Sequence, residues 1–475
     1  MWNFLRTDPR RREKGAAEPL FLMWIVQEGM GENMSVGQKF AKYVSQNVLG
    51  MIGISLYILA DTFFISKAVG AAGITALNLV LPIYNLIFAV GAMLGVGSAI
   101  RYAVAKGRGD GEASDYFSNA LIWGTVFGIL FMIPGGLLPG KIVALLGGDA
   151  QIVAVGAPYT RIFMMFSPCF IWNSVCNAFV RNDGAPGTAM AATLLSSLFN
   201  IVMDYVLMFP LGLGMEGAAF ATACSPIVGV LICGAHLCSK KCGVTFRFRK
   251  PSAKQLYASC QVGVSAFVGE ISSGVITVAF NMIILRLAGN IGVAAYGVVA
   301  NTSLVAVSMF NGVAQGAQPL LSEFYGKGAQ DKVQKVIRLG IMTSLALAVL
   351  IVVGVYFGAD DIAAVFNSER DAQLAQYAGV GLRLYFIGFL FAGINITGTG
   401  ILSATESARW AFATSILRGF ALILIAAFGL SALFGMRGVW LAFPAAEAVT
   451  LAVTAAALKS TLKRSCDGQW ESKLL

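Results

Sequence analysis

Charged side chains are scarce in this sequence. Only 12% of its 475 residues are Asp, Glu, Lys or Arg, whereas 57% are hydrophobic. A soluble globular domain carries about a quarter charged residues, because its surface faces water. Long polar linkers are also missing, and the apolar runs that replace them are each about 20 residues long, enough to cross a hydrocarbon core of about 30 Å. These absences exclude a soluble protein.

Other classes of protein are excluded by motifs that the sequence lacks. It has no phosphate-cradling P-loop and no soluble nucleotide-binding segment, so ATP is not expected to supply energy, and no enzymatic site is predicted. The eight cysteines lie in apolar runs or on one side of them, which argues against disulfides. His236, Cys238 and Cys242 offer three metal-binding side chains, but without a second pair they are a weak zinc motif.

The first residues are unlike the rest of the chain. Pro19 to Val26 form an apolar stretch that is too short to span a membrane, and no signal-peptidase site follows it. We expect either a cytoplasmic amphipathic tail or an upstream start codon, with Met30 or Met34 as the true start.

The apolar runs predict twelve membrane-spanning helices, because a backbone in lipid must satisfy its own hydrogen bonds and no alternating barrel pattern is present. The expected fold class is an all-α membrane protein with two six-helix lobes. The predicted spans are 41–66, 76–104, 116–138, 151–180, 186–209, 217–239, 256–288, 293–322, 333–357, 373–402, 408–432 and 437–459.

The positions of Lys and Arg predict the orientation. Most of the 34 basic residues lie on one side of the predicted spans, and the strongest group runs from Lys240 to Lys254. The opposite loops carry acids such as Asp360, Asp361, Glu369 and Asp371. By the positive-inside rule, both termini are cytoplasmic. Since the basic residues are spread over separate loops, nucleic-acid binding is not expected.

The two halves of the chain repeat at an offset of 221 residues. Gly91 and Gly95 recur as Gly312 and Gly316, Lys106-Gly107 recurs as Lys327-Gly328, and the turn that begins at Gly214 recurs at Gly435. Six spans per half give both halves the same orientation, which is a parallel repeat of the kind that secondary transporters use. The alternative is a structural duplication without transport. The predicted segments are a cytoplasmic N-terminal extension (1–36), an N-terminal lobe (37–240), a basic cytoplasmic linker (241–255), a C-terminal lobe (256–460) and a cytoplasmic tail (461–475).

Several segments resemble those of the multidrug and toxic compound extrusion (MATE) family, in particular its DinF-like bacterial branch. The resemblance runs from about residue 37 to 460 and rests on Ala60 to Phe64, Ala76-Leu77 with Pro82, Asn200 to Asp204, Gly214 to Ala219, and Gln315 to Ser322 followed by Tyr325-Gly326. It implies a V-shaped pair of lobes that alternates between outward- and inward-facing states. It also implies export of cationic, lipophilic compounds against Na⁺ or H⁺ entry.

One departure from the family concerns proline. The family often has a proline early in its first and seventh spans, but here these regions read Val44 to Asn47 and Val262 to Ser265. A mechanism that depends on a proline-centred bend of the first helix is therefore not expected for this chain.

Four polar residues of the N-terminal half form the candidate ion-coupling site. Asp61, Asp204 and Thr222 each lie about five residues from the outer end of their span, which places them roughly 7 Å below the boundary, and Asn200 lies one turn deeper than Asp204. Charge inside a membrane is costly and marks functional residues. We expect Na⁺ or H⁺ to bind here, and the family resemblance marks the same positions. The alternative is that Asp61 and Asp204 are merely acids at the membrane interface. The repeat argues against this alternative, because the scaffold repeats but the acids do not. The positions in the C-terminal half that correspond to the four residues are near Asn281, Ala421, Ile425 and Phe443.

The C-terminal half has a second group of charges near the predicted midplane, formed by Glu270, Arg383, Arg418 and Glu447. Two acids and two arginines suggest one neutral network, because buried charges persist when paired. The network is either a static structural cluster, or a second protonation site or substrate contact. Residues of the substrate cavity are a weaker prediction, based on the affinity of Met and aromatic side chains for varied cations: Met164, Met165, Phe166, Phe280, Met282 and Met309.

The main hypothesis is a monomeric secondary drug exporter of the bacterial plasma membrane, without a cofactor other than its coupling ion. A flippase for a lipid-linked sugar is the second hypothesis, although it would need unpaired cavity arginines to neutralise a pyrophosphate. A non-transporting membrane sensor is the third, and it usually adds a soluble domain. The natural substrate and the choice between Na⁺ and H⁺ stay open at this point.

Overall fold

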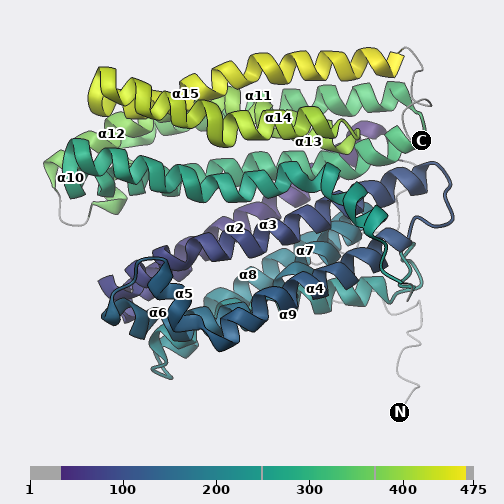
Figure 1. The fold of residues 1–475 in the computed structure, drawn as a ribbon. Coiled ribbons are helices and arrows are strands. Elements are labelled where there is room, and N and C mark those ends of the chain that lie inside the picture. Colours follow the sequence, from purple (N-terminus) through teal and green to yellow (C-terminus); the bar gives the residue numbers. More distant parts are fainter. Residues whose placement is uncertain (1–33, 248–249, 368–370, 467–475) are drawn as a thin grey trace, which may run out of the picture.

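The structure is a computed structural model that describes residues 34–247, 250–367 and 371–466. Most of the predicted N-terminal extension and C-terminal tail, and the residues Arg249 and Glu369, lie outside the described residues. All regular elements of the described part are helices, arranged in two bundles (Figure 1). They are α2 (Val36–Ala68), α3 (Ala71–Gly107), α4 (Asp115–Leu137), α5 (Pro139–Leu145), α6 (Ala150–Met165), α7 (Ser167–Asn182), α8 (Pro186–Met208), α9 (Gly214–Leu237), α10 (Ala253–Gly326), α11 (Gln330–Phe366), α12 (Ala372–Phe386), α13 (Phe389–Ala404), α14 (Ala408–Ile416), the π-helical η1 (Leu417–Ala421) and α15 (Leu422–Cys466).

Two helices are much too long for one membrane crossing, and each of them contains a reversal of the chain. A straight helix of the 74 residues in α10 would be about 110 Å long. Instead, its backbone leaves the helical region at Gly289, where φ is +62°, a conformation that favours glycine. The rings of Phe280 and Tyr296, on either side of this point, stack with their centroids 5.3 Å apart. The chain therefore folds back on itself, and α15 contains the same feature at Gly435, with φ at +58°.

Two further spans are broken near their middle. Helices α6 and α7 meet at 48°, and α12 and α13 meet at 50°. With each bent pair taken as one span, and with α10 and the α14–η1–α15 segment each taken as two, the predicted number of twelve spans is confirmed.

The 221-residue repeat appears in the backbone itself. Gly214 and its counterpart Gly435 both have positive φ, at +50° and +58°. The break after α6 falls at Phe166, and the break after α12 begins at Ile387, which is again 221 residues later. Because backbone breaks and bends recur at the offset predicted from sequence, the two lobes are copies of one architecture.

Each lobe has its own apolar core. One core joins helices α2 to α9, and the other joins α10, α11, α12, α13 and α15 without a residue from the first lobe. In Figure 1 the purple-to-teal N-terminal lobe lies beside the green-to-yellow C-terminal lobe. We call the end of the molecule that carries the loops 108–114, 183–185, 238–247 and 405–407 the basic face, because Lys240 and Lys241 lie there.

Glycines bring the lobes together in the half of the molecule toward the basic face. A Cβ atom added to Gly97 of α3 would lie 2.1 Å from the carbonyl oxygen of Ser259, and one added to Gly316 of α10 would lie 2.7 Å from the Cα of Val44. Such contacts leave no room for any side chain, which is how membrane helices pack without a hydrophobic driving force. The lobe interface near the basic face is therefore tightly closed.

Arginines of the N-terminal lobe complete this interface. Arg101 Nη1 lies 2.5 Å from Glu406 Oε1, and Arg108 Nη2 lies 3.2 Å from Glu406 Oε2. Glu406 belongs to the C-terminal lobe, where it follows α13 with a φ of +55°. We call Arg101, Arg108 and Glu406 the lobe latch. Deeper in the interface, the buried Arg181 donates to Asn47 Oδ1 (3.0 Å) and to Gln315 of the other lobe.

Candidate functional site

Small residues set the close approach of α2 to α8 in the N-terminal lobe. A Cβ atom on Gly53 would lie 2.5 Å from Leu194 Cδ2, and one on Gly50 would lie in ordinary van der Waals contact with Thr193, at 3.7 Å. Helix α8 is in turn tied to α9, where Ser196 Oγ donates a hydrogen bond of 2.5 Å to the carbonyl oxygen of Ser225. Together these contacts fix the depth and rotation of α2, α8 and α9, which carry the predicted ion-coupling residues.

The structure brings the four predicted residues together. Asn200 and Asp204 are fully buried, and Asp61 and Thr222 are at most 9% exposed. With its amide oriented so that both atoms are satisfied, Asn200 donates to Asp204 Oδ2 (3.3 Å) and accepts from the backbone N–H of Thr222 (3.3 Å). Asp61 lies close enough for its charge to act on Asp204.

Neither carboxylate of this site is neutralised. Asp61 Oδ1 and Asp204 Oδ1 have no hydrogen-bond partner, and neither residue forms an ion pair among the described residues. Two buried carboxylates at close range cannot both stay charged without a cation or a proton, because desolvation and mutual repulsion both oppose ionisation. The arrangement is therefore suited to bind and release a small cation.

Three tyrosines around the carboxylates were not predicted. The hydroxyl groups of Tyr57 and Tyr84 lie 3.2 Å apart, and Tyr159 lies against Thr222 and near both acids. Tyr57 precedes Asp61 by one helical turn and so lies on the same face of α2. That spacing was visible in the sequence and is the signal that could have identified it.

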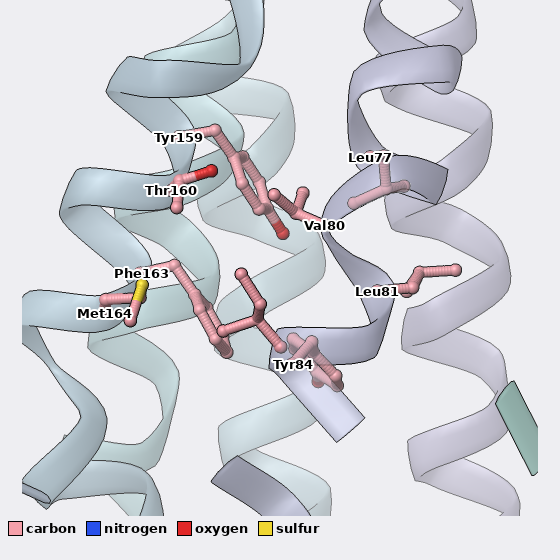
Figure 2. Close-up of a pocket in the computed structure, with 9 residues that line it drawn as sticks. Leu77, Val80, Leu81, Tyr84, Tyr159, Thr160, Phe163 and Met164 are labelled. Atoms are coloured by element: carbon pink, nitrogen blue, oxygen red, sulfur yellow. The ribbon is translucent and has the colours of Figure 1, made fainter. Parts of the chain in front are cut away.

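A small cavity lies beside these tyrosines. Figure 2 shows Tyr159, Phe163 and Met164 on one helix facing Leu77, Val80 and Tyr84 on another. The cavity has a volume of about 10 Å³, roughly the room that one water molecule needs. The predicted cavity residue Met164 does line it. In this state of the protein, however, the cavity does not have the size of a drug molecule.

The other predicted cavity residues have varied positions. Met165 and Met282 are 44% and 54% exposed, Met309 is partly buried, and Phe166 forms the break between α6 and α7. Phe280 lines no cavity in this state, because its ring is fully buried in the C-terminal core, stacked on Tyr296. Residue type and depth do not distinguish a side chain of the core from one that lines a cavity.

The predicted charged network of the C-terminal lobe was wrong as a single cluster. Arg383 pairs with Asp360 (2.6 Å), which lies inside α11 because that helix extends to Phe366. Glu270 has no hydrogen-bond or ion-pair partner among the described residues. The four charges therefore do not form one network.

Two members of the predicted network do form a pair. Glu447 is 2% exposed, and its Oε1 accepts from Arg418 Nη2 (2.9 Å) and Nε (3.2 Å). Its Oε2 accepts from Asn395 Nδ2 (2.7 Å). Arg418 lies in the π-helical turn η1, whose Gly419 contacts Ser272 of α10. This carboxylate, unlike Asp61 and Asp204, is fully satisfied by protein groups.

Comparisons with known proteins place these features in context. The family model MatE matches residues 48–206 and 266–428. The multidrug export protein MepA of Staphylococcus aureus (strain MSSA476) is 26% identical over 395 residues, which cover 82% of this chain and 86% of MepA. MepA of Staphylococcus saprophyticus is 25% identical over 411 residues, which cover 86% of this chain and 90% of that protein.

Solved structures share the fold. The outward-facing conformation of a multidrug resistance MATE family transporter superposes with a TM-score of 0.86 at 21% identity, covering 96% of this chain and all of the other. A MATE structure in the straight conformation gives a TM-score of 0.85 at 21% identity, covering 91% of this chain and 98% of the other. The unbroken α2, which has no proline, agrees with the absence of a proline-centred bend.

Proposed function

The chain belongs to the MatE family, and from this premise we propose that it exports cationic, lipophilic compounds in exchange for Na⁺ or H⁺. The observation that carries the proposal is the pair of buried, unpaired carboxylates of Asp61 and Asp204. A coupling site must change its occupancy during the cycle, and acids held permanently by arginine would be unable to do so. The multidrug export named for the MepA relatives supports the same activity.

Alternating access is the mechanism that we propose. The lobes close on each other through glycines and the lobe latch near the basic face, and the outward-facing transporter of the same fold supports the assignment of an outward-facing state. Cation binding at Asp61 and Asp204 would change the packing of α2 against α8 and α9. Because α2 also contacts α10 of the other lobe, such a change would reach the lobe interface.

The surroundings of the protein follow from its charge pattern. We place it in the bacterial plasma membrane as a monomer, with the basic face and both termini in the cytoplasm. A lipid-linked sugar flippase is less well supported, since Arg383 and Arg418 are both neutralised by acids and do not offer free positive charge to a pyrophosphate.

Asp61→Asn and Asp204→Asn test the proposal directly. Each change removes a charge but keeps shape and hydrogen-bonding capacity, so helix packing and expression should stay near normal. We expect ion-driven efflux of ethidium from proteoliposomes to be lost, while ethidium binding is retained or only modestly weakened. Imposing a Na⁺ gradient and a H⁺ gradient separately identifies the coupling ion.

Glu216→Gln is the matched control. Glu216 is an exposed acid at the start of α9, and its loss should leave efflux unchanged. Wild-type efflux rates in both aspartate variants would show that these acids only lie near the membrane–water interface, and the coupling mechanism would then be abandoned.

A further inference from the structure

Three metal-binding side chains converge beneath the basic face of the N-terminal lobe. Asp183 follows the end of α7, His236 lies in the last turn of α9, and Cys242 lies in the loop that leads toward the second lobe. Their ligand atoms all lie within 4.8 Å of one another. His236 is the only histidine in the sequence, and the three residues come from segments that are far apart in the chain.

The separation of these atoms matches a single ion. His236 Nε2 lies 3.3 Å from Asp183 Oδ2. Nitrogen and oxygen ligands that bind zinc tetrahedrally at about 2.0–2.1 Å are themselves about 3.3–3.4 Å apart. The imidazole and the carboxylate are therefore at the separation that a shared ion requires, and without an ion the same separation is that of their direct hydrogen bond.

Hydrogen bonds hold the carboxylate of Asp183 in place at both of its oxygens. Its Oδ1 accepts from Tyr102 Oη (2.9 Å) and Lys106 Nζ (2.9 Å), while Oδ2 accepts from the backbone N–H of Gly243 (2.9 Å). Supporting hydrogen bonds of this kind orient the ligands of metal sites. Burial opposes ionisation of Asp183, but the hydrogen bond and charge of Lys106 outweigh it and hold the pKa of this carboxyl below its usual value.

We propose that Asp183, His236 and Cys242 bind one zinc-class divalent ion, with water as the fourth ligand. A thiolate beside an imidazole selects such a borderline ion over Mg²⁺ or Ca²⁺, which require oxygen ligands. Binding displaces the thiol proton of Cys242. The ligand set differs from the sequence motif, because Cys238 is exposed at the end of α9 and Asp183 takes its place.

The site would anchor the start of the connection between the lobes. Beyond Cys242, this connection already follows α4, since the N–H of Thr245 donates to Ser114 Oγ (3.2 Å) and that of Arg247 donates to Ser118 Oγ (2.8 Å). An ion on Cys242 extends this attachment to α7 and α9. The proposal concerns ion binding and stability, and it does not depend on the transport activity.

Lys106 gives the site a distinctive property. Its side chain is 47% exposed and its charge lies 2.9 Å from Asp183 Oδ1, so it competes electrostatically with a bound cation. Lys106→Gln should therefore tighten metal binding. If the cluster is only a hydrogen-bonded structural element, neither the wild type nor Lys106→Gln should bind the metal.

Cobalt titration of the chelator-treated, purified protein in detergent tests the site. We expect one Co²⁺ per chain, with thiolate-to-cobalt charge-transfer absorption and the visible bands of tetrahedral coordination, both lost when Zn²⁺ is added. Cys242→Ser should abolish the charge-transfer absorption. His236→Gln should weaken binding by at least the roughly 10–100-fold that is typical of losing a supporting residue alone. Zn²⁺ should raise the melting temperature of the wild type but not of Cys242→Ser.

Cys238→Ser is the matched control, because it removes a neighbouring thiol outside the proposed ligand set and should leave the spectrum unchanged. Absence of the cobalt spectrum in folded wild-type protein would overturn the proposal. A spectrum that persists in Cys242→Ser or disappears in Cys238→Ser would overturn the ligand set.

Discussion

At the scale of single residues, the structure separates two kinds of buried acid. Glu447 is matched by Arg418 and Asn395, so each of its oxygens has a partner. Asp61 and Asp204 each keep an oxygen without one. Since a buried charge without a partner is costly, the first arrangement stabilises the fold and the second is suited to a group that exchanges its cation.

This distinction predicts that substitution of Glu447 lowers the stability of the protein. Glu447→Gln leaves Arg418 without its charge partner, and breaking a buried ion pair costs about 3–5 kcal/mol; because Arg418 is partly exposed, we expect the lower part of this range. The double variant Glu447→Gln/Arg418→Met should recover much of the loss. Melting in detergent measures both.

Glu270→Gln is the control for that experiment. Glu270 has no partner among the described residues, so its substitution should leave the melting temperature near that of the wild type. A destabilisation as large as that of Glu447→Gln would show that Glu270 belongs to the same network after all.

At the scale of helices, the sequence predicted the number and positions of the spans well. Apolar length determines where a helix crosses, and the repeat of Gly214 at Gly435 marked a turn that both lobes share. The breaks within two spans were not predicted, because apolar composition continues through them. Pro168, just after the break at Phe166, was the available signal, since proline removes a backbone donor and restricts the residue before it.

The turn at Gly435 offers a prediction at this scale. At φ +58° and ψ −134° the backbone is in a region that is populated almost only by glycine, where a side chain costs about 1–3 kcal/mol, so Gly435→Ala should lower the melting temperature. Gly354 is its matched control: it lies inside α11 with no atom within 4 Å of an added Cβ. Gly354→Ala should stabilise by about 0.5–1 kcal/mol. Equal effects of the two substitutions would show that Gly435 is not constrained by its backbone.

At the scale of the whole molecule, the depth of a residue in the membrane could be predicted from sequence, but the direction of its side chain around the helix could not. Counting residues from the ends of the spans correctly brought Asp61, Asp204 and Thr222 together, because small residues pack α2, α8 and α9 closely. The same count failed for Arg383, whose partner Asp360 was expected in a loop. Side-chain direction depends on how helices pack, and the apolar pattern of a membrane span reports it only weakly.

The charge asymmetry of the loops predicts the orientation of the molecule. A reporter inserted after Lys250 should lie in the cytoplasm, and one inserted after Asn367, at the end of α11, should lie outside. Parallel fusions to a phosphatase that is active outside and a fluorescent protein that folds inside measure this. Placement of both positions on one side would contradict the model of twelve spans.

The lobe latch makes the closed basic face testable. Glu406 is a carboxylate of the C-terminal lobe that meets two arginines of the other lobe, in a backbone conformation that is unfavourable for glutamate. Both ion pairs must break if the lobes separate at this face. The latch therefore stabilises the present state relative to one that opens toward the basic side.

Glu406→Gln should shift that equilibrium. Hydrogen bonds to charged groups contribute about 1.5–3 kcal/mol, so the loss of one charge should favour opening of the basic face by roughly tenfold or more. Spin labels at Gly111 and Asp331, exposed on the two lobes near the basic face, should move apart, and labels at Lys67 and Arg286 on the opposite face should approach. Glu323→Gln is the control, because Glu323 pairs with Lys327 at the end of α10, in its own lobe and not across the lobes. If both variants give wild-type distance distributions, Glu406 holds only its own loop, and the closed state depends on the glycine packing of α3 against α10.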